Sequence, residues 1–172
     1  MREGLSFVHN ALIGVGLRDR IRIGVSGKIT TAFDMARAMA LGADWCNSGR
    51  GFMFALGCLQ SLSCHTDRCP TGVATQDPTR GRALVVADKW QRVANFHRAT
   101  LQVLAEFCAA VGVEHPDQIR PEHISRRLNM HEVQNFAQLY PHLAEGELLS
   151  GTYDPRFQPA WRMADAHSFM PL

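Results

Sequence analysis

The sequence lacks the long apolar and basic runs that mark several classes of protein. No stretch reaches the ~18 consecutive apolar residues of a membrane-spanning helix, and the first residues lack the basic and apolar segments of a secretory signal. The net charge is only +2, and lysine and arginine form no cluster. This argues against a nucleic-acid surface, because such surfaces neutralise many phosphates. We therefore expect a soluble, cytoplasmic protein with no nucleic-acid partner.

Composition and length indicate one small globular unit in a reducing compartment. The 172 residues are 46% hydrophobic and 20% charged, which is ordinary for a single domain. Five cysteines is an odd number, and three of them cluster, which suits metal ligation better than a disulfide framework. The other two, Cys46 and Cys108, are expected in the core as small hydrophobic residues.

The three clustered cysteines lie in the segment CLQSLSCHTDRCPTGVATQ, with five and then four residues between them. Zinc and iron–sulfur clusters both take thiolate ligands, and a short loop can bring three sulfurs round one centre. Cys58, Cys64 and Cys69 are therefore candidate metal ligands. With His65 as a fourth ligand they would form a tetrahedral zinc site. The alternative is that the three cysteines are unrelated and partly buried.

The first part of the chain predicts a parallel strand–helix–strand unit. The expected elements, in chain order, are a helix over 5–17, a strand over 21–25, a helix over 31–41, a strand over 43–47 and a helix over 50–57. Thr31 and Asp34 provide the hydroxyl and carboxylate of a helix start, and Gly42 is expected to end that helix. Strand, helix and strand within about 30 residues form one βαβ unit.

Each predicted strand ends in a turn that contains glycine and leads towards a helix. The two turns are Ser26-Gly27-Lys28 and Ser48-Gly49-Arg50. A strand, a glycine turn and a helix N-terminus place unpaired backbone N–H groups where a phosphate can bind, and Lys28 and Arg50 could add positive charge. The alternative is that these glycines only permit a positive φ.

The second part of the chain predicts mostly helices. A long amphipathic helix is expected over 83–111, with an apolar stripe that runs from Val86 through Trp90 to Cys108. Gly112 should end it. Proline near each start signal predicts two short helices before residue 129.

Beyond Asn129 the helix signals fade. Glycine and proline there favour an extended tail, and Tyr153, Phe157 and Trp161 are expected to anchor it.

The cysteine segment carries a family resemblance. Cys58-x5-Cys64-His65-x3-Cys69-Pro70-x-Gly72-Val73-Ala74-Thr75-Gln76-Asp77 resembles the cysteine loop of the FMN-binding synthase domain of glutamate synthase. Upstream, Ile23 to Lys28 and Asn47 to Arg50 resemble that family's two flavin-phosphate turns. The resemblance covers about residues 5 to 128. It departs from the family pattern at Ser26, where a glycine is commoner, and at Arg50, where a small residue is.

The resemblance implies a fold, two cofactors and their ligands. The fold would be the C-terminal portion of a (β/α)8 TIM-type barrel, its last two βα units, because a complete barrel takes about 250 residues. Cys58, Cys64 and Cys69 would hold a 3Fe-4S cluster, which needs no histidine. Residues 26–28 and 48–50 would bind the FMN phosphate. The implied divisions are barrel end and cysteine loop over 1–81, packed helices over 82–128, and a mostly helical C-terminal extension over 129–172.

The activity implied by the resemblance is that of a flavin oxidoreductase. Electrons would pass from a ferredoxin or an NAD(P)H-linked partner through the cluster to FMN, and FMN would reduce 2-iminoglutarate, formed from 2-oxoglutarate and ammonia, to glutamate. Two alternatives stay open: a flavoenzyme of the same family with another substrate, and a truncated module that holds a metal and catalyses nothing. A truncated barrel exposes a sheet edge, so we expect a homo-oligomer or a poorly soluble chain.

Overall fold

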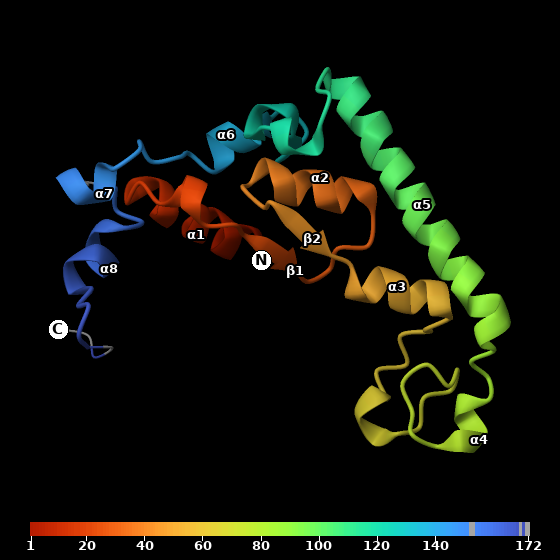
Figure 1. The fold of residues 1–172 in the computed structure, drawn as a ribbon. Helices are drawn as coiled ribbons and strands as arrows, with labels where there is room; N and C mark the ends of the chain where they lie inside the picture. The colour runs from red at the N-terminus through yellow and green to blue at the C-terminus, as the bar shows by residue number, and fades with distance from the viewer. Residues whose placement is uncertain (152–153, 169, 171–172) are drawn as a thin grey trace.

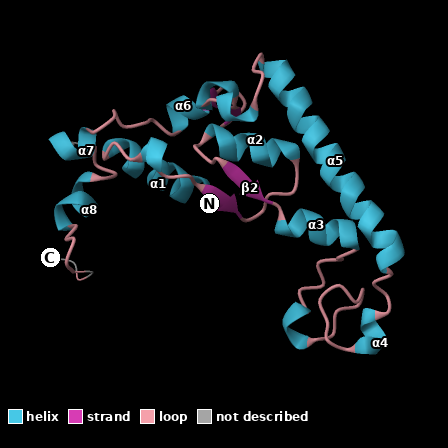
Figure 2. Ribbon diagram, in the orientation of Figure 1, coloured by secondary structure: helices cyan, strands magenta, loops and turns pink. Residues whose placement is uncertain are grey.

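The structure, a computed structural model, describes residues 1–151, 154–168 and 170. It is a mixed α/β arrangement of helices around two short two-stranded sheets (Figures 1 and 2). Within the described residues the strands do not close into a barrel. None of the helices described there combines the length and apolarity needed to cross a bilayer.

The predicted βαβ unit is present at the centre of the fold. Strand β1 (Gly24–Ser26) pairs in parallel with β2 (Trp45–Asn47), and helix α2 (Ala32–Ala40) connects them. Thr31 and Asp34 form the predicted capping box, in which each side chain bonds the other residue's backbone N–H. Both strands are three residues long, shorter than predicted, because only these residues pair.

Helix α1 (Arg2–Gly14) precedes this unit and starts and ends three residues earlier than predicted. Helix α3 (Gly49–Leu56) follows β2 almost directly and ends at Gly57. The chain then runs through the cysteine loop, which contains the 3-10 helix η2 (Cys64–Thr66), to the short helix α4 (Pro78–Gly81). Figure 1 shows the loop and α4 together at one end of the long helix that follows.

The long helix α5 (Val86–Val111) is confirmed, but its predicted apolar stripe is buried at one end only. It contacts α3 and α2, and only Leu104 and Cys108 are fully buried on it. The side chains of Val86 and Trp90 are 71% and 60% exposed. The apolar stripe is therefore not covered over this half, where the helix extends beyond the core.

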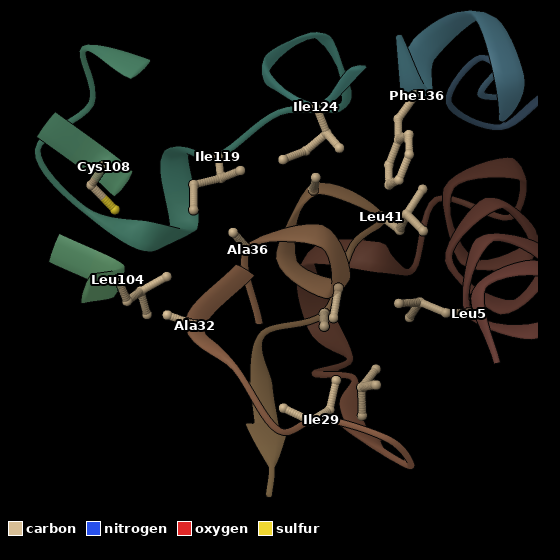
Figure 3. Close-up of a cluster of buried hydrophobic side chains, with 14 residues drawn as sticks. Leu5, Ile29, Ala32, Ala36, Leu41, Leu104, Cys108, Ile119, Ile124 and Phe136 are labelled. Carbon is tan, nitrogen blue, oxygen red and sulfur yellow. The ribbon is translucent and has the colours of Figure 1, made fainter. Parts of the chain in front are cut away.

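One hydrophobic core joins α1, the βαβ unit and the inner part of α5 (Figure 3). Helix α2 lies at its middle and presents small side chains, at Ala32, Ala36 and Ala40. Because alanine has no bulk beyond Cβ, the elements around α2 can approach its backbone closely. Phe136, 1% exposed, fills the far side of the core.

Within the described residues, the chain beyond Asn129 contains short helices, so the prediction of a simply extended tail was wrong, whereas the two short helices predicted before residue 129 are present as 3-10 helices. The elements that follow α5 are the 3-10 helices η3 (Pro116–Gln118) and η4 (Pro121–His123), the antiparallel strands β3 (Ser125–Arg127) and β4 (Val133–Asn135), and the helices α6 (Phe136–Leu139), α7 (Glu147–Ser150) and α8 (Gln158–Met163). Local side chains start these helices despite the sparse apolar pattern; Asn135, for example, forms a capping box with Gln138.

The predicted aromatic anchors differ from one another. Phe157 is 3% exposed and stacks on Phe7 of α1, with ring centroids 4.8 Å apart. Trp161 is 40% exposed and does not anchor the tail in the same way. Tyr153 lies outside the described residues. Phe157 therefore attaches this segment to α1, together with Leu143 and Leu148.

Candidate functional site

The two glycine turns lie side by side at one edge of the parallel sheet. Ser26 and Asn47 are paired in register, so both strands end at the same level. Gly27 and Lys28 then have φ values of +112° and +57°. Two consecutive residues with positive φ are rare, and one of them is not glycine, which is the kind of backbone strain that concentrates at functional sites.

The second turn leaves the first N–H groups of α3 without partners. Ser48 occupies the N-cap position, but its side chain makes no capping hydrogen bond. Its hydroxyl instead donates to the backbone carbonyl of Ile29, 2.7 Å away. In the described structure the N–H groups of Gly49, Arg50 and Gly51 donate to no other residue. Gly51 is buried, whereas Gly49 and Arg50 are exposed. The N–H groups of these two residues are available to an anion, which the positive end of the helix dipole would favour.

A cavity of about 380 Å³ joins both turns to the cysteine loop. The predicted site residues that line it are Ser26, Gly27, Lys28, Gly49, Arg50, Cys58 and Cys64. Ser48 is not among the lining residues, because its side chain faces the first turn. Met53 and Phe54 of α3 add an apolar wall. The cavity falls within the range of small-molecule sites.

The residues of this cavity fit a phosphate group. A Cβ built on Gly49 meets no atom within 4 Å, so space lies open beside the unpaired N–H groups. Lys28 and Arg50 are exposed at its rim, and no ion pair of either side chain occurs in the described structure. A phosphate placed here would find two cations and several N–H donors.

The three cysteines occupy different environments. Cys58 is half-buried and Cys64 is exposed, and both line the cavity. Cys69 is buried, 5% exposed, and its sulfur lies 3.6 Å from the hydroxyl of Thr71. Hydrogen bonds from the Thr71 hydroxyl and from the backbone N–H groups of Ala74 and Thr71 lower the pKa of the Cys69 thiol from 9.0 to about 7. The loop thus stabilises the thiolate form of this side chain.

Asp67 closes the cysteine loop, and sequence reasoning did not identify it. Its carboxylate accepts from the hydroxyl of Thr75 at 2.9 Å and from the backbone N–H of Gln76 at 2.5 Å. Its own backbone has a φ of +62°, which aspartate tolerates better than most residues. The two sides of Cys69 are therefore tied together by one side chain.

The described residues do not contain three or more His, Cys, Asp or Glu side chains grouped closely enough to hold a metal ion. Cys58 and Cys64 share a cavity, whereas Cys69 does not line it. The geometry as it stands therefore does not fit a cluster held by all three sulfurs. His65 is exposed in η2. The choice between an iron–sulfur and a zinc ligand set stays a prediction.

A larger cavity, of about 770 Å³, lies at the opposite ends of the strands. Arg18 organises it, donating from Nε to Nδ1 of His9 at 2.8 Å and forming an ion pair of 2.9 Å with Asp44. Burial lowers the pKa of His9 to about 4, and the charges of His142 and Arg18 act in the same direction. This network joins α1, the sheet and the C-terminal segment. No sequence motif indicated it, because its members are far apart in the chain.

Comparisons with known proteins give the same assignment as the cysteine loop. The family described as "Conserved region in glutamate synthase" matches residues 1–114. The glutamate synthase large subunit-like protein YerD of Bacillus subtilis is 42% identical over 123 residues, which are 72% of this chain and 23% of that protein. Ferredoxin-dependent glutamate synthase 2 of Arabidopsis thaliana is 31% identical over 171 residues, 98% of this chain and 10% of that protein.

The archaeal glutamate synthase [NADPH] of Methanocaldococcus jannaschii is 37% identical over 105 residues, 61% of this chain and 21% of that protein. The chain thus spans less than a quarter of the length of each of these three relatives. The family match nevertheless covers 114 of its 172 residues, including both glycine turns and all three clustered cysteines. The chain belongs to the glutamate synthase family.

Proposed function

We propose that this chain forms the flavin-phosphate end of a glutamate synthase-type oxidoreductase that uses FMN. The observation that carries the proposal is the single cavity lined by both glycine turns and by Cys58 and Cys64. The convergence itself follows from the pairing of the two parallel strands, but the open space beside Gly49, the unpaired N–H groups and the two exposed cations at this cavity serve no backbone role. This combination favours a shared anionic ligand over the simpler interpretation.

The residues of the cavity would act on the phosphate by binding and orienting it. The N–H groups of Gly49 and Arg50 at the start of α3 would donate to the phosphate, and the guanidinium of Arg50 and the ammonium of Lys28 would neutralise its charge. Met53 and Phe54 would exclude water from one side. Bound FMN would supply hydride transfer. The described loop does not bring the three sulfurs together, so the roles proposed for these residues end at the flavin phosphate.

The proposal also covers the substrate, the electron donor and the barrel that would complete the site. The family assignment supports glutamate formation from 2-oxoglutarate and ammonia through 2-iminoglutarate. An electron donor would be a ferredoxin-like protein or an NAD(P)H-linked subunit, as the names of two relatives indicate for those proteins.

Strands β1 and β2 would be the last two strands of a (β/α)8 barrel. Within the described residues each strand pairs only with the other, so further strands, or a second copy, could extend the sheet.

Flavin content and glutamate formation test the proposal directly. The protein at its natural length should purify with FMN, and with chemically reduced viologen it should convert 2-oxoglutarate and ammonia to glutamate. Replacing Lys28 and Arg50 together with glutamine should release the FMN and leave the fold intact, because both side chains are exposed. A matched double change at exposed Arg82 and Arg98, away from the cavity, should not. A wild-type protein that binds no flavin and forms no glutamate would overturn the proposal.

A further inference from the structure

The hydroxyl of Ser48 does not act as an N-cap, although serine is among the best N-cap residues. A capping serine would accept from the N–H of the second or third helical residue and would thereby occupy a donor at the start of α3. Here the hydroxyl is donated to the carbonyl of Ile29, which belongs to the other glycine turn. The interaction is partly buried and joins residues 19 apart in the chain.

The hydrogen bond from Ser48 to Ile29 fixes the C-terminal end of the first glycine turn. The near end of the turn is already fixed, because Ser26 pairs in register with Asn47. Ile29 is 2% exposed, with its side chain in the core, and its carbonyl is bonded to Ser48. Consecutive residues of the second turn, Asn47 and Ser48, therefore fix both ends of the first. Only Gly27 and Lys28 lie between, both in the positive-φ region.

We infer that Ser48 is a positioning residue that sets the distance between the two phosphate turns and leaves the N–H groups of α3 unpaired for the ligand. The inference rests on the proposed function, since it assigns Ser48 a role in FMN binding through other residues. One side-chain direction has both effects. It ties the strained Gly27-Lys28 segment to the sheet, and the hydroxyl makes no hydrogen bond to the N–H groups at the start of α3.

Hydrogen exchange measured without flavin tests the Ser48–Ile29 hydrogen bond separately from any contact between Ser48 and the ligand. In Ser48→Ala, the backbone amides of residues 27–30 should exchange faster, because the far end of the turn is no longer held. FMN affinity should fall about fivefold, the usual effect of one lost hydrogen bond. Ser48→Thr retains the hydroxyl and should restore both values. Thr100→Ala is a matched control, because the Thr100 hydroxyl also donates to a backbone carbonyl, that of Phe96 at 2.8 Å, but within α5.

The outcomes separate the possible roles. Faster exchange at 27–30 together with weaker FMN binding, both restored by Ser48→Thr, supports the positioning role. Weaker FMN binding with unchanged exchange would show that Ser48 contacts the ligand directly and would overturn it. Unchanged exchange and unchanged binding would overturn it as well, while leaving the proposed function standing. A wild-type protein without FMN would overturn the proposed function, and the role of Ser48 in FMN binding with it.

Discussion

The side-chain oxygen of Asn10 accepts a hydrogen bond of 2.7 Å from the backbone N–H of Leu143, and this bond joins α1 to a segment 133 residues later. Asn10 is fully buried, and its amide also donates to the carbonyl of Ser6. One turn further along α1, Gly14 leaves the space that Leu148 occupies. Because a buried amide is costly unless it is satisfied, Asn10 and Gly14 together make this face of α1 specific for the C-terminal segment.

Gly14→Ala should detach that segment, since the new Cβ would lie 2.5 Å from Cγ of Leu148. We expect a loss of about 1 to 2 kcal/mol in the free energy of unfolding, because overpacking outweighs the gain in helix propensity. The matched control is Gly4→Ala in the same helix, where a Cβ meets nothing within 4 Å; it should stabilise by up to about 1 kcal/mol. Urea denaturation measures both. Equal effects at the two sites would contradict the packing argument.

Stability should fall as the pH drops from 6.5 towards 4, because of His9. The folded state keeps His9 neutral, with its pKa lowered from 6.5 to about 4, so the unfolded chain takes up a proton that the native chain refuses. Above pH 6.5 this penalty is absent. Burial also lowers the pKa of His142, which lies 5.1 Å from His9 between ring centroids. At His9, the carboxylate of Asp44 opposes the lowering of the pKa and Arg18 reinforces it. At His142, the carboxylate of Glu122 opposes the lowering and Arg156 reinforces it.

Urea midpoints measured between pH 7 and pH 4 would show this dependence. His9→Gln keeps an acceptor for the Arg18 Nε hydrogen bond but cannot take up a proton, so its curve should be flatter than that of the wild type. An NMR titration of the His9 ring should give a midpoint well below that of a free histidine. A wild-type slope in His9→Gln would show that other groups cause the acid sensitivity.

Short-range sequence patterns predicted the helices, strands and turns better than they predicted which distant residues each of them contacts. The Thr31–Asp34 capping box and the convergence of the two glycine turns follow from short-range patterns and from the geometry of parallel strands. The direction of the Ser48 hydroxyl does not, because an N-cap serine alone predicts the opposite bond. The Asn10–Leu143 pair joins distant segments that share no periodicity. For Val86 and Trp90 the spacing showed which face of α5 is apolar, but not whether anything covers it.

Gly49→Leu should separate ligand binding from folding. The position has open space and an ordinary backbone, so a leucine there should cost no stability and should raise the helix propensity of α3. The same side chain would project into the space beside the unpaired N–H groups and keep a phosphate away from them. We expect loss of FMN with an unchanged melting temperature. Gly81→Leu, at a second glycine with open surroundings, should leave the flavin bound, and retention of flavin in Gly49→Leu would remove this residue from the site.

The cysteine substitutions decide between the metal hypotheses, because each hypothesis needs a different ligand set. A three-iron cluster requires three thiolates, so Cys58→Ser, Cys64→Ser and Cys69→Ser should each abolish iron, sulfide and the broad visible absorbance, whereas His65→Ala should retain them. Loss of iron in all three serine variants would also mean that binding draws Cys69 towards the cavity that Cys58 and Cys64 already line.

Two controls test whether such a loss comes from ligation or from packing. Burial raises the pKa of the Cys46 thiol to about 11, and Cys108 is 4% exposed, so neither is suited to act as a thiolate ligand. Cys46→Ser and Cys108→Ser should cost about 1 kcal/mol each and leave the metal content unchanged. Wild-type protein prepared without oxygen that contains zinc but no iron, or a His65→Ala variant that loses its metal, would replace the cluster with a zinc site, because only the tetrahedral zinc site needs the histidine as its fourth ligand.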